Sequence, residues 1–202
     1  MTKEQLNMTY SLGNIDEITS LDEKTKETLL LEILGDISND KNSSTFREGV
    51  TLGILGVSQN KNKLGYDSDD EPIEVKPKNL DSTSTTKFNG SGNFSDFTWK
   101  RHQKYKDDNV KMAVSGFYNG KLIFLVTFKY NSESFTNEIE RQLKKHLPDG
   151  DKQNSYVRSV KFSYKHYESS DSLKVEYITP DVDKLEHMFT KNFLIMLKNG
   201  IK

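Results

Sequence analysis

The longest apolar stretch of the chain is interrupted by a single turn signal. Apolar runs at 112–118 and 122–128 flank Asn119-Gly120. Asn-Gly between two such runs predicts a tight β-hairpin, because both residues accept positive φ angles. The second run is apolar at every position from 122 to 126, which indicates a strand covered on both faces. We therefore expect a central sheet with helices on each side.

Apolar residues at helical spacing predict several helices around this sheet. Ser20 and Glu23 have the spacing of a capping box, and the helix that they open is expected to run to about residue 37. Further helices are expected at 45–57, at 96–108 with Ser95 as cap, from Ser132 or Ser134 to about His146, and from Pro180 onward. The segment 45–57 also contains glycines and a Val-Thr pair, so a strand remains the alternative there.

Alternating apolar and polar positions predict a second hairpin near the C-terminal end. Residues 155–167 and 173–178 alternate in this way on either side of Ser169-Ser170-Asp171. Each alternation is typical of a strand with one buried face, and the polar segment between them is typical of a turn. We expect these two strands to pair with each other.

A third hairpin is expected at 64–78, around an acidic turn centred between residues 70 and 71. Antiparallel pairing about this turn places Asp67 opposite Glu74, on one face of the strand pair. Lys76 follows Glu74 by two residues and points to the same face. Pro77 has no amide hydrogen, so the ladder is expected to stop there.

Composition narrows the classes of protein that remain. The chain has 202 residues, a net charge of -1 and no cysteine, which excludes disulfides, thiolate nucleophiles and cysteine zinc sites. The four histidines lack metal-ligand spacing, and no Gly-x-Ser-x-Gly elbow is present. No apolar run approaches the ~18 residues of a membrane span, and the polar start lacks a signal-peptide core. We expect a cytoplasmic protein.

The hairpin at 64–78 carries the chemistry that the rest of the chain lacks. Two carboxylates side by side on a strand pair repel each other unless a cation neutralises them. Magnesium suits such a site, because it usually takes one or two protein carboxylates together with water. The pattern of Asp67 followed by Glu74-Val75-Lys76 resembles the PD-(D/E)xK nuclease superfamily, the fold of most type II restriction endonucleases. Tyr66 stands where that family has proline, and the gap between the acids is shorter than usual.

This resemblance implies roles for individual residues. Asp67 and Glu74 would bind Mg²⁺, assisted by the Val75 carbonyl, and Lys76 would orient the attacking water or stabilise the transition state. Asp69 or Asp70 replaces Asp67 if the turn is placed differently. In the family a helix before the first catalytic strand often carries another acid. Glu48 is the candidate here, and a surface glutamate in a first helical turn is the other interpretation.

Residues after the motif are candidates for contacts with DNA. Lys78 follows the strand, and the long polar loop at 79–93 contains Lys87, Asn89 and Asn93 among glycines that let backbone amides approach phosphates. The expected helix at 96–108 interleaves bases and aromatics, which is typical of a DNA-facing helix. Its candidate contacts are Lys100, Arg101 and Lys104. The alternatives are a plain surface loop and a solvated helix face.

The sequence as a whole predicts an α/β protein whose central mixed sheet is flanked by helices in a restriction-endonuclease-like core. We divide the single domain into a helical N-terminal region (1–44), the catalytic core (45–130), and peripheral helices with a hairpin (131–202). The predicted function is a magnesium-dependent, sequence-specific endonuclease that acts on double-stranded DNA as a homodimer. The alternatives are a non-catalytic DNA-binding or protein-interaction module and a repair or structure-specific nuclease.

Overall fold

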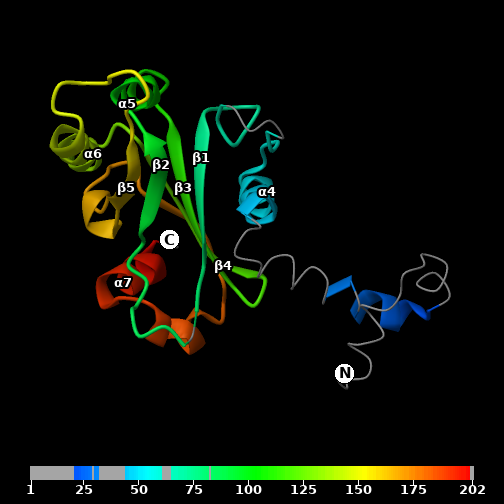
Figure 1. Cartoon of the computed structure of the whole chain (residues 1–202). Coiled ribbons are helices and arrows are strands. Elements are labelled where there is room, and N and C mark those ends of the chain that lie inside the picture. Colours follow the sequence, from blue (N-terminus) through cyan, green and yellow to red (C-terminus); the bar gives the residue numbers. More distant parts are fainter. Residues whose placement is uncertain (1–20, 29, 32–43, 61–64, 82, 201–202) are drawn as a thin grey trace.

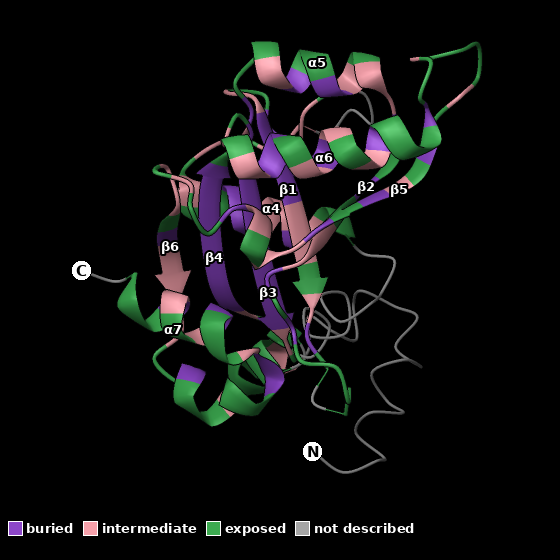
Figure 2. Cartoon of the chain, turned by 90° about the vertical axis from the view of Figure 1, so that its left-hand side faces the viewer, coloured by how far each residue is buried: buried purple, intermediate pink, exposed green. Residues whose placement is uncertain are grey.

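The computed structural model describes residues 21–28, 30–31, 44–60, 65–81 and 83–200. The chain is an α/β protein built on a four-stranded mixed sheet. The order of its strands is β1 (Ile73–Asn79), β3 (Lys111–Tyr118), β4 (Lys121–Lys129) and β6 (Lys174–Ile178). Only β1 and β3 run parallel, and the other neighbours are antiparallel. The two central strands are buried along most of their length (Figure 2).

The hairpin predicted around Asn119-Gly120 is confirmed. It joins β3 to β4, and the two turn residues have φ angles of 47° and 75°. This left-handed conformation is the one that Asn and Gly accept most readily. Gly116 in β3 lies so close to the Phe124 ring that an added Cβ would stand 2.1 Å from Cε1. The β3–β4 pair therefore requires residues that accept positive φ angles in its turn, and a glycine at position 116 beside the Phe124 ring.

The hairpin predicted between 155–167 and 173–178 is wrong. Both strands form, but β5 (Val157–Phe162) pairs with β2 (Gly92–Phe97) in a separate two-stranded sheet, whereas β6 pairs with β4. Tyr167, between the strands, stacks on Phe128 with ring centroids 4.2 Å apart, and its hydroxyl donates to the carbonyl of Gly90 at 2.8 Å. This buried anchor directs the connection away from a tight turn.

Helices cover the sheet on both faces (Figure 1). Helix α4 (Ser44–Leu55) packs on one face, where a small core consists of Leu52, Ile73, Val75, Ala113 and Leu125. The two-stranded sheet, α6 (Glu133–His146) and α7 (Lys191–Asn199) lie on the other side. The larger, aromatic core lies there, with β3 and β4 contributing to it. The predicted helices at 45–57 and from 132 or 134 to 146 are thus confirmed.

Two predicted helices have different bounds. Helix α5 spans Trp99–Asp107, and its N-cap is Thr98 rather than Ser95, because Ser95 belongs to β2 and pairs with Ser159. The expected C-terminal helix is divided into the 3₁₀ helix η2 (Val182–Met188) and α7. They are separated where Phe189 forms a bridge with Phe88.

Near the N-terminus, residues 23–28 and 30–31 are helical, and the Asp22 carboxylate accepts the Thr25 N–H at 3.0 Å. Ser20 and the apolar positions 29, 33, 34 and 37, which were predicted to start and line this helix, lie outside the residues or side chains that the structure describes. Among the described residues, no helix has the length and apolar character needed to cross a bilayer.

The hairpin predicted at 64–78 forms only in part. Asp67 lies in a bend rather than a strand, and its main chain donates to the Ile73 carbonyl at 3.0 Å. The adjoining Ser68 forms an isolated bridge with Gln59 instead of pairing with β1. The predicted stop at Pro77 is also wrong, because β1 continues to Asn79. Strand β1 is at the edge of its sheet, and an edge strand tolerates a residue without an N–H.

Candidate functional site

The edge strand β1 carries the candidate site because its alternating side chains face two different layers. Val75 is buried in the small core under α4. Its neighbours Glu74 and Lys76 point to the opposite side, where Glu74 meets α5 and the Lys76 ammonium lies 5.0 Å from the centre of the Phe94 ring in β2. The period-2 geometry of a strand thus separates one packing residue from two residues of the candidate site.

Glu74 is a buried carboxylate with protein donors on both oxygens. It is only 4% exposed. Its Oε2 accepts the hydroxyl of Tyr105 at 2.5 Å, and its Oε1 interacts with the Lys76 ammonium and, at 3.4 Å, with the Arg101 guanidinium. Burial alone would raise the pKa of Glu74, but the charges of Lys76 and Arg101 and the hydrogen bonds outweigh it and lower this pKa. Glu74 therefore stays ionised at neutral pH.

Asp67 lies next to this group through a loop contact rather than through strand pairing. Its Oδ2 accepts the Val75 N–H at 2.6 Å. Burial and the negative charge of Glu74 raise the pKa of Asp67 to about 6, although the Val75 hydrogen bond and the charge of Lys76 oppose the change. The structure thus brings Asp67, Glu74 and Lys76 together, as the sequence predicted, but by a different backbone route.

Glu48 is a third acid beside the same group. It projects from the first half of α4, and burial, with a contribution from the charge of Glu74, raises its pKa. A hydrogen bond with Ser44 and, after it, the charge of Lys76 oppose this rise. The interpretation of Glu48 as an acid near the site therefore agrees with its place in the fold. We call Glu48, Asp67, Glu74 and Lys76 the acid cluster.

The donor set suits a hard cation that is only partly enclosed by protein. Within the described ranges, no group of three or more His, Cys, Asp or Glu side chains is arranged to hold a metal ion. Magnesium, however, is commonly bound by one or two carboxylates together with water and substrate phosphate. Burial is the main cause of the raised carboxyl pKa values of Asp67 and Glu48, and the charge of Lys76 offsets it only in part. The carboxylate oxygens of Asp67 and Glu48 match this preference in number and chemical type.

The other acids of the predicted turn have different partners. Asp70 accepts the Ser58 N–H, and the Asp69 N–H donates to the Ser58 carbonyl. Both side chains are exposed. These hydrogen bonds connect the turn to Ser58, in the segment after α4. The structure shows no contact of either residue with Glu74. Val75 meets Asp67 through its N–H and not through the carbonyl that was predicted to assist a metal.

A basic groove of about 1270 Å³ opens beside the acid cluster. Lys76 lines it, so the groove and the cluster share a residue. Its other cationic side chains come from α4, the end of β1, the loop after it, α6 and the region of β5: Arg47, Lys78, Lys87, Arg141, Lys145, Lys161 and Lys165. Asp81 and Glu138 are the acidic residues among those that line the groove. A chain with net charge -1 thus concentrates positive charge in one concave surface.

The predicted DNA contacts fall into two groups. Lys78, Lys87, Asn89 and Asn93 line the basic groove together with Lys76.

The three predicted contacts on α5 do not line the groove. Arg101 turns inward to Glu74 and Tyr105. Lys104 lies 4.5 Å from the centre of the Tyr66 ring and pairs with Asp108, while Lys100 is exposed beside the loop that holds Asp151. Arg101 and Lys104 therefore contribute to the structure around α5 rather than to the groove.

No protein-family model matches this chain, and no curated protein matches it. Sequence reasoning missed Tyr105 as a partner of Glu74, and it assigned Arg101 to DNA. The available signal was their spacing of four residues, which places both on one face of a helix. That signal does not say which distant residue the face will meet.

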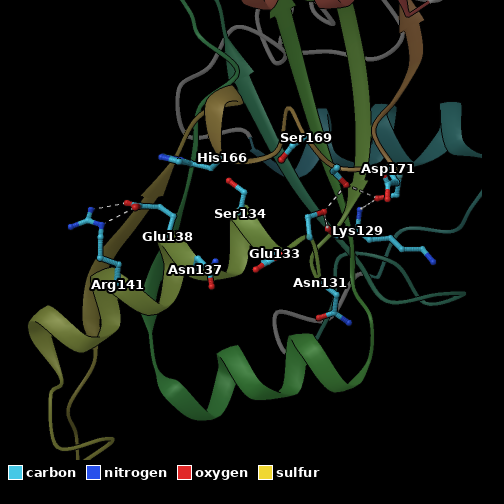
Figure 3. Close-up of a pocket in the computed structure, with 13 residues that line it drawn as sticks. Lys129, Asn131, Glu133, Ser134, Asn137, Glu138, Arg141, His166, Ser169 and Asp171 are labelled. Atoms are coloured by element: carbon cyan, nitrogen blue, oxygen red, sulfur yellow. Dashed lines mark hydrogen bonds and ion pairs between the residues drawn. The ribbon is translucent and has the colours of Figure 1, made fainter.

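A second hollow, of about 1100 Å³, lies at the start of α6 (Figure 3). Five serines contribute to its wall, and some of them bond to each other, as Ser132 does to Ser170 at 2.5 Å and Ser170 to Ser172 at 2.9 Å. Glu138 and Arg141, which form an ion pair at 2.8 Å, line both this hollow and the basic groove. The second hollow therefore adjoins the basic groove but lacks its excess of cations, since Glu133, Glu138 and Asp171 line it together with Lys129 and Arg141.

Proposed function

We propose that this protein is a magnesium-dependent endonuclease that hydrolyses phosphodiester bonds of double-stranded DNA, with a restriction-endonuclease-like core. The observation that carries the proposal is the position of Lys76, which belongs at once to the acid cluster and to the basic groove. A polyanion bound along the groove would bring a phosphate to the Lys76 ammonium and the carboxylates beside it. Lysine and arginine contacts to phosphates are the main source of affinity for nucleic acid.

The residues of the acid cluster divide the proposed work. Asp67 and Glu48 would hold magnesium, which when bound supplies charge neutralisation for the scissile phosphate. Lys76 would contact a phosphate oxygen or orient the attacking water, and it would stabilise the negative charge that develops in the transition state. Glu74 keeps the Lys76 ammonium at the edge of the groove. The cations of the groove would hold the DNA backbone and fix its register.

A plasmid digestion tests the proposal. Supercoiled plasmid is incubated with magnesium and the wild-type chain, and then with Lys76→Ala and Asp67→Asn. We expect nicked and linear products from the wild type and a loss of at least 100-fold in rate for each variant. Lys104→Ala is the matched control, because it removes an exposed lysine outside the groove. Intact plasmid with every salt and plasmid tried would contradict the proposal.

The pattern of products separates the forms of nuclease. Discrete bands would indicate a sequence-specific enzyme of the restriction type, for which we expect a two-fold homodimer because both strands of a palindromic site must be cut. A smear would favour a repair or structure-specific nuclease with the same chemistry. Sedimentation of the protein with and without a DNA duplex measures the oligomeric state independently.

One observation favours a second candidate, a DNA-binding module without catalysis. Both oxygens of Glu74 are already occupied by protein donors. Ion-pair networks of this kind also occur in proteins where they serve the structure and not catalysis. In that case the groove would bind duplex DNA with the usual dependence on salt. The DNA would stay intact with or without magnesium, both with the wild type and with Lys76→Ala.

A further inference from the structure

Helix α5 holds Glu74 through two side chains that face β1. Tyr105 donates its hydroxyl proton to Glu74 Oε2 at 2.5 Å. The same hydroxyl oxygen accepts two N–H groups of Arg101, from Nε at 3.0 Å and from Nη2 at 2.6 Å. Arg101 also donates to Glu74 at 3.4 Å. Arg101 and Tyr105 thus form one hydrogen-bonded unit, which we call the α5 clamp, and this unit ends on the buried carboxylate.

The α5 clamp is itself fixed in place. The guanidinium of Arg101 lies 5.4 Å from the Phe97 ring and 5.1 Å from the Tyr105 ring, and its Nη1 donates to the Ser95 carbonyl of β2 at 3.3 Å. Burial and the charge of Glu74 raise the pKa of Tyr105, so its hydroxyl remains a donor at all working pH values. The clamp therefore presents a proton donor and a positive charge that do not depend on the groove.

Lys76 has a different environment from the α5 clamp. It shares Glu74 Oε1 with Arg101, but its side chain is 19% exposed and lines the basic groove. If Lys76 were the only partner of Glu74, its movement to another anion would leave a buried carboxylate without compensation. Removing one partner of a buried ion pair is strongly unfavourable for that reason.

We infer that Arg101 and Tyr105 are positioning residues that balance and orient Glu74, so that Lys76 is available to an incoming phosphate. The inference rests on the proposed function only in naming a phosphate as the group that takes Lys76. Its structural half, that the clamp keeps the Glu74 carboxylate ionised when Lys76 leaves it, holds or fails without any DNA cleavage.

The first test follows the carboxyl carbon of Glu74 by NMR while the pH is varied, on the full chain labelled with ¹³C. Tyr105→Phe removes only the hydroxyl, and we expect it to raise the pH at which Glu74 titrates by about one unit, the size of one charge-assisted hydrogen bond. Tyr66→Phe is the matched control, because the Tyr66 ring packs 5.6 Å from the Tyr105 ring while its hydroxyl bonds to Asp108. Equal titrations in wild type and Tyr105→Phe would overturn the inference.

The second test removes Lys76. In Lys76→Ala, Glu74 should still be ionised at pH 7, because Arg101 and Tyr105 remain. In Arg101→Gln, where Lys76 remains but the clamp is broken, the titration should also move upward, because Arg101 supplies part of the compensation of Glu74. A Glu74 that is protonated at pH 7 in Lys76→Ala would show that Lys76, and not the clamp, sustains the carboxylate.

A double-mutant cycle separates positioning from a general loss of structure. Tyr105→Phe in a Glu74→Gln background should change the thermal midpoint less than it does in wild type, because the charged acceptor is gone.

If the chain cuts DNA, Tyr105→Phe should lower kcat about tenfold with KM unchanged. If the chain does not cut DNA, the proposed function fails while the titrations still decide the clamp. Cleavage with an unshifted Glu74 titration in Tyr105→Phe would refute the clamp alone.

Discussion

At the scale of single residues, the dominant feature is a carboxylate buried among cations. Glu74 is ionised in an environment that by itself disfavours charge, because Lys76, Arg101 and Tyr105 compensate it. Such a group contributes little to the free energy of unfolding while its partners are present. Removing it lowers this free energy strongly, because the buried cations lose their counter-charge. Glu74 therefore has a structural consequence as well as a proposed chemical one.

Glu74→Ala should destabilise the fold by about 3 kcal/mol, because it leaves Lys76 and Arg101 without their shared acceptor in a largely buried site. Urea denaturation followed by circular dichroism measures the change. Glu71→Ala is the control: it breaks an ion pair with Lys111 in which both side chains are about 40% exposed, and such pairs contribute less than about 1 kcal/mol. A loss at Glu74 no larger than at Glu71 would contradict this account.

Asp67→Asn should stabilise the chain at pH 8 by about 1 kcal/mol, less than the full pKa shift implies because Asp67 is partly exposed. The folded-state pKa of about 6 lies above the ordinary value of 3.8. The folded state therefore takes up the proton first, and wild-type stability from this group rises as the pH falls from about 7 to 4. The variant, with its neutral amide, would lack that pH dependence. Thermal unfolding at pH 8 and pH 5 measures both effects.

Sequence reasoning found the acids and the lysine because their spacing is local. Asp67, Glu74 and Lys76 lie within ten residues, so any compact turn brings them close. It failed at Tyr105 and Arg101, because these reach Glu74 from a helix about 30 residues further along the chain and only the packing of β2 and α5 brings them there. The sequence also placed Asp67 on a strand, since it could not show that Ser68 would pair with Gln59.

At the scale of elements, α5 owes its position to contacts at its first turn. The Thr98 side chain accepts the Arg101 N–H at 3.1 Å. The carboxylate of Asp151, from the loop after α6, accepts the N–H groups of Trp99 at 2.9 Å and Lys100 at 2.8 Å. Helix N-termini favour such a negative charge. These contacts tie the helix that carries the α5 clamp to a loop far away in the sequence.

Asp151→Ala should lower the stability of the fold by about 1 kcal/mol, the usual size of a lost N-terminal cap. Because α5 carries Arg101 and Tyr105, the NMR signals of both residues should also change. Asp149→Ala is a suitable control, since Asp149 pairs only with Lys152 at the surface. Equal effects of the two substitutions would show that Asp151 does not cap α5.

Elements with strong local signals were predictable and elements that depend on a partner were not. The β3–β4 hairpin has its own turn chemistry, and α6 has acids early and bases late, which suits the helix dipole. Strand β2, in contrast, begins within a segment rich in glycine, serine and asparagine, and it exists because Phe94 and Phe97 are buried and pair with β5. Such pairing is set by tertiary structure, which outweighs local propensity.

At the scale of the whole molecule, the basic groove is the main electrostatic feature. Its cations come from segments that are distant in the sequence, and the net charge of the chain gave no sign of it. A local cluster of this kind can attract nucleic acid although the protein as a whole has a net charge of -1. The groove joins α4, β1, α6 and the β5 region into one surface.

Replacing Lys161 and Lys165 together by alanine should weaken the binding of duplex DNA at all sequences. It should also reduce the slope of log K against log salt by about 2, one counterion for each lost phosphate contact. Fluorescence anisotropy of a labelled duplex at several salt concentrations measures both. Lys174→Ala with Lys184→Ala removes two exposed lysines outside the groove. If that pair changes the slope as much, the groove is not the binding surface.

The thin layer formed by α4 has a consequence for dynamics. Its core contains few residues, and the Thr51–Ser115 hydrogen bond of 2.8 Å is its polar link to β3. Local unfolding of this helix should cost less than global unfolding, so its amides should exchange with solvent before those of β3 and β4. Opening would carry Glu48 away from Asp67. Any ligand that bridges these two acids must therefore oppose the opening, and slower hydrogen exchange confined to residues 44–55 would report its arrival without a substrate.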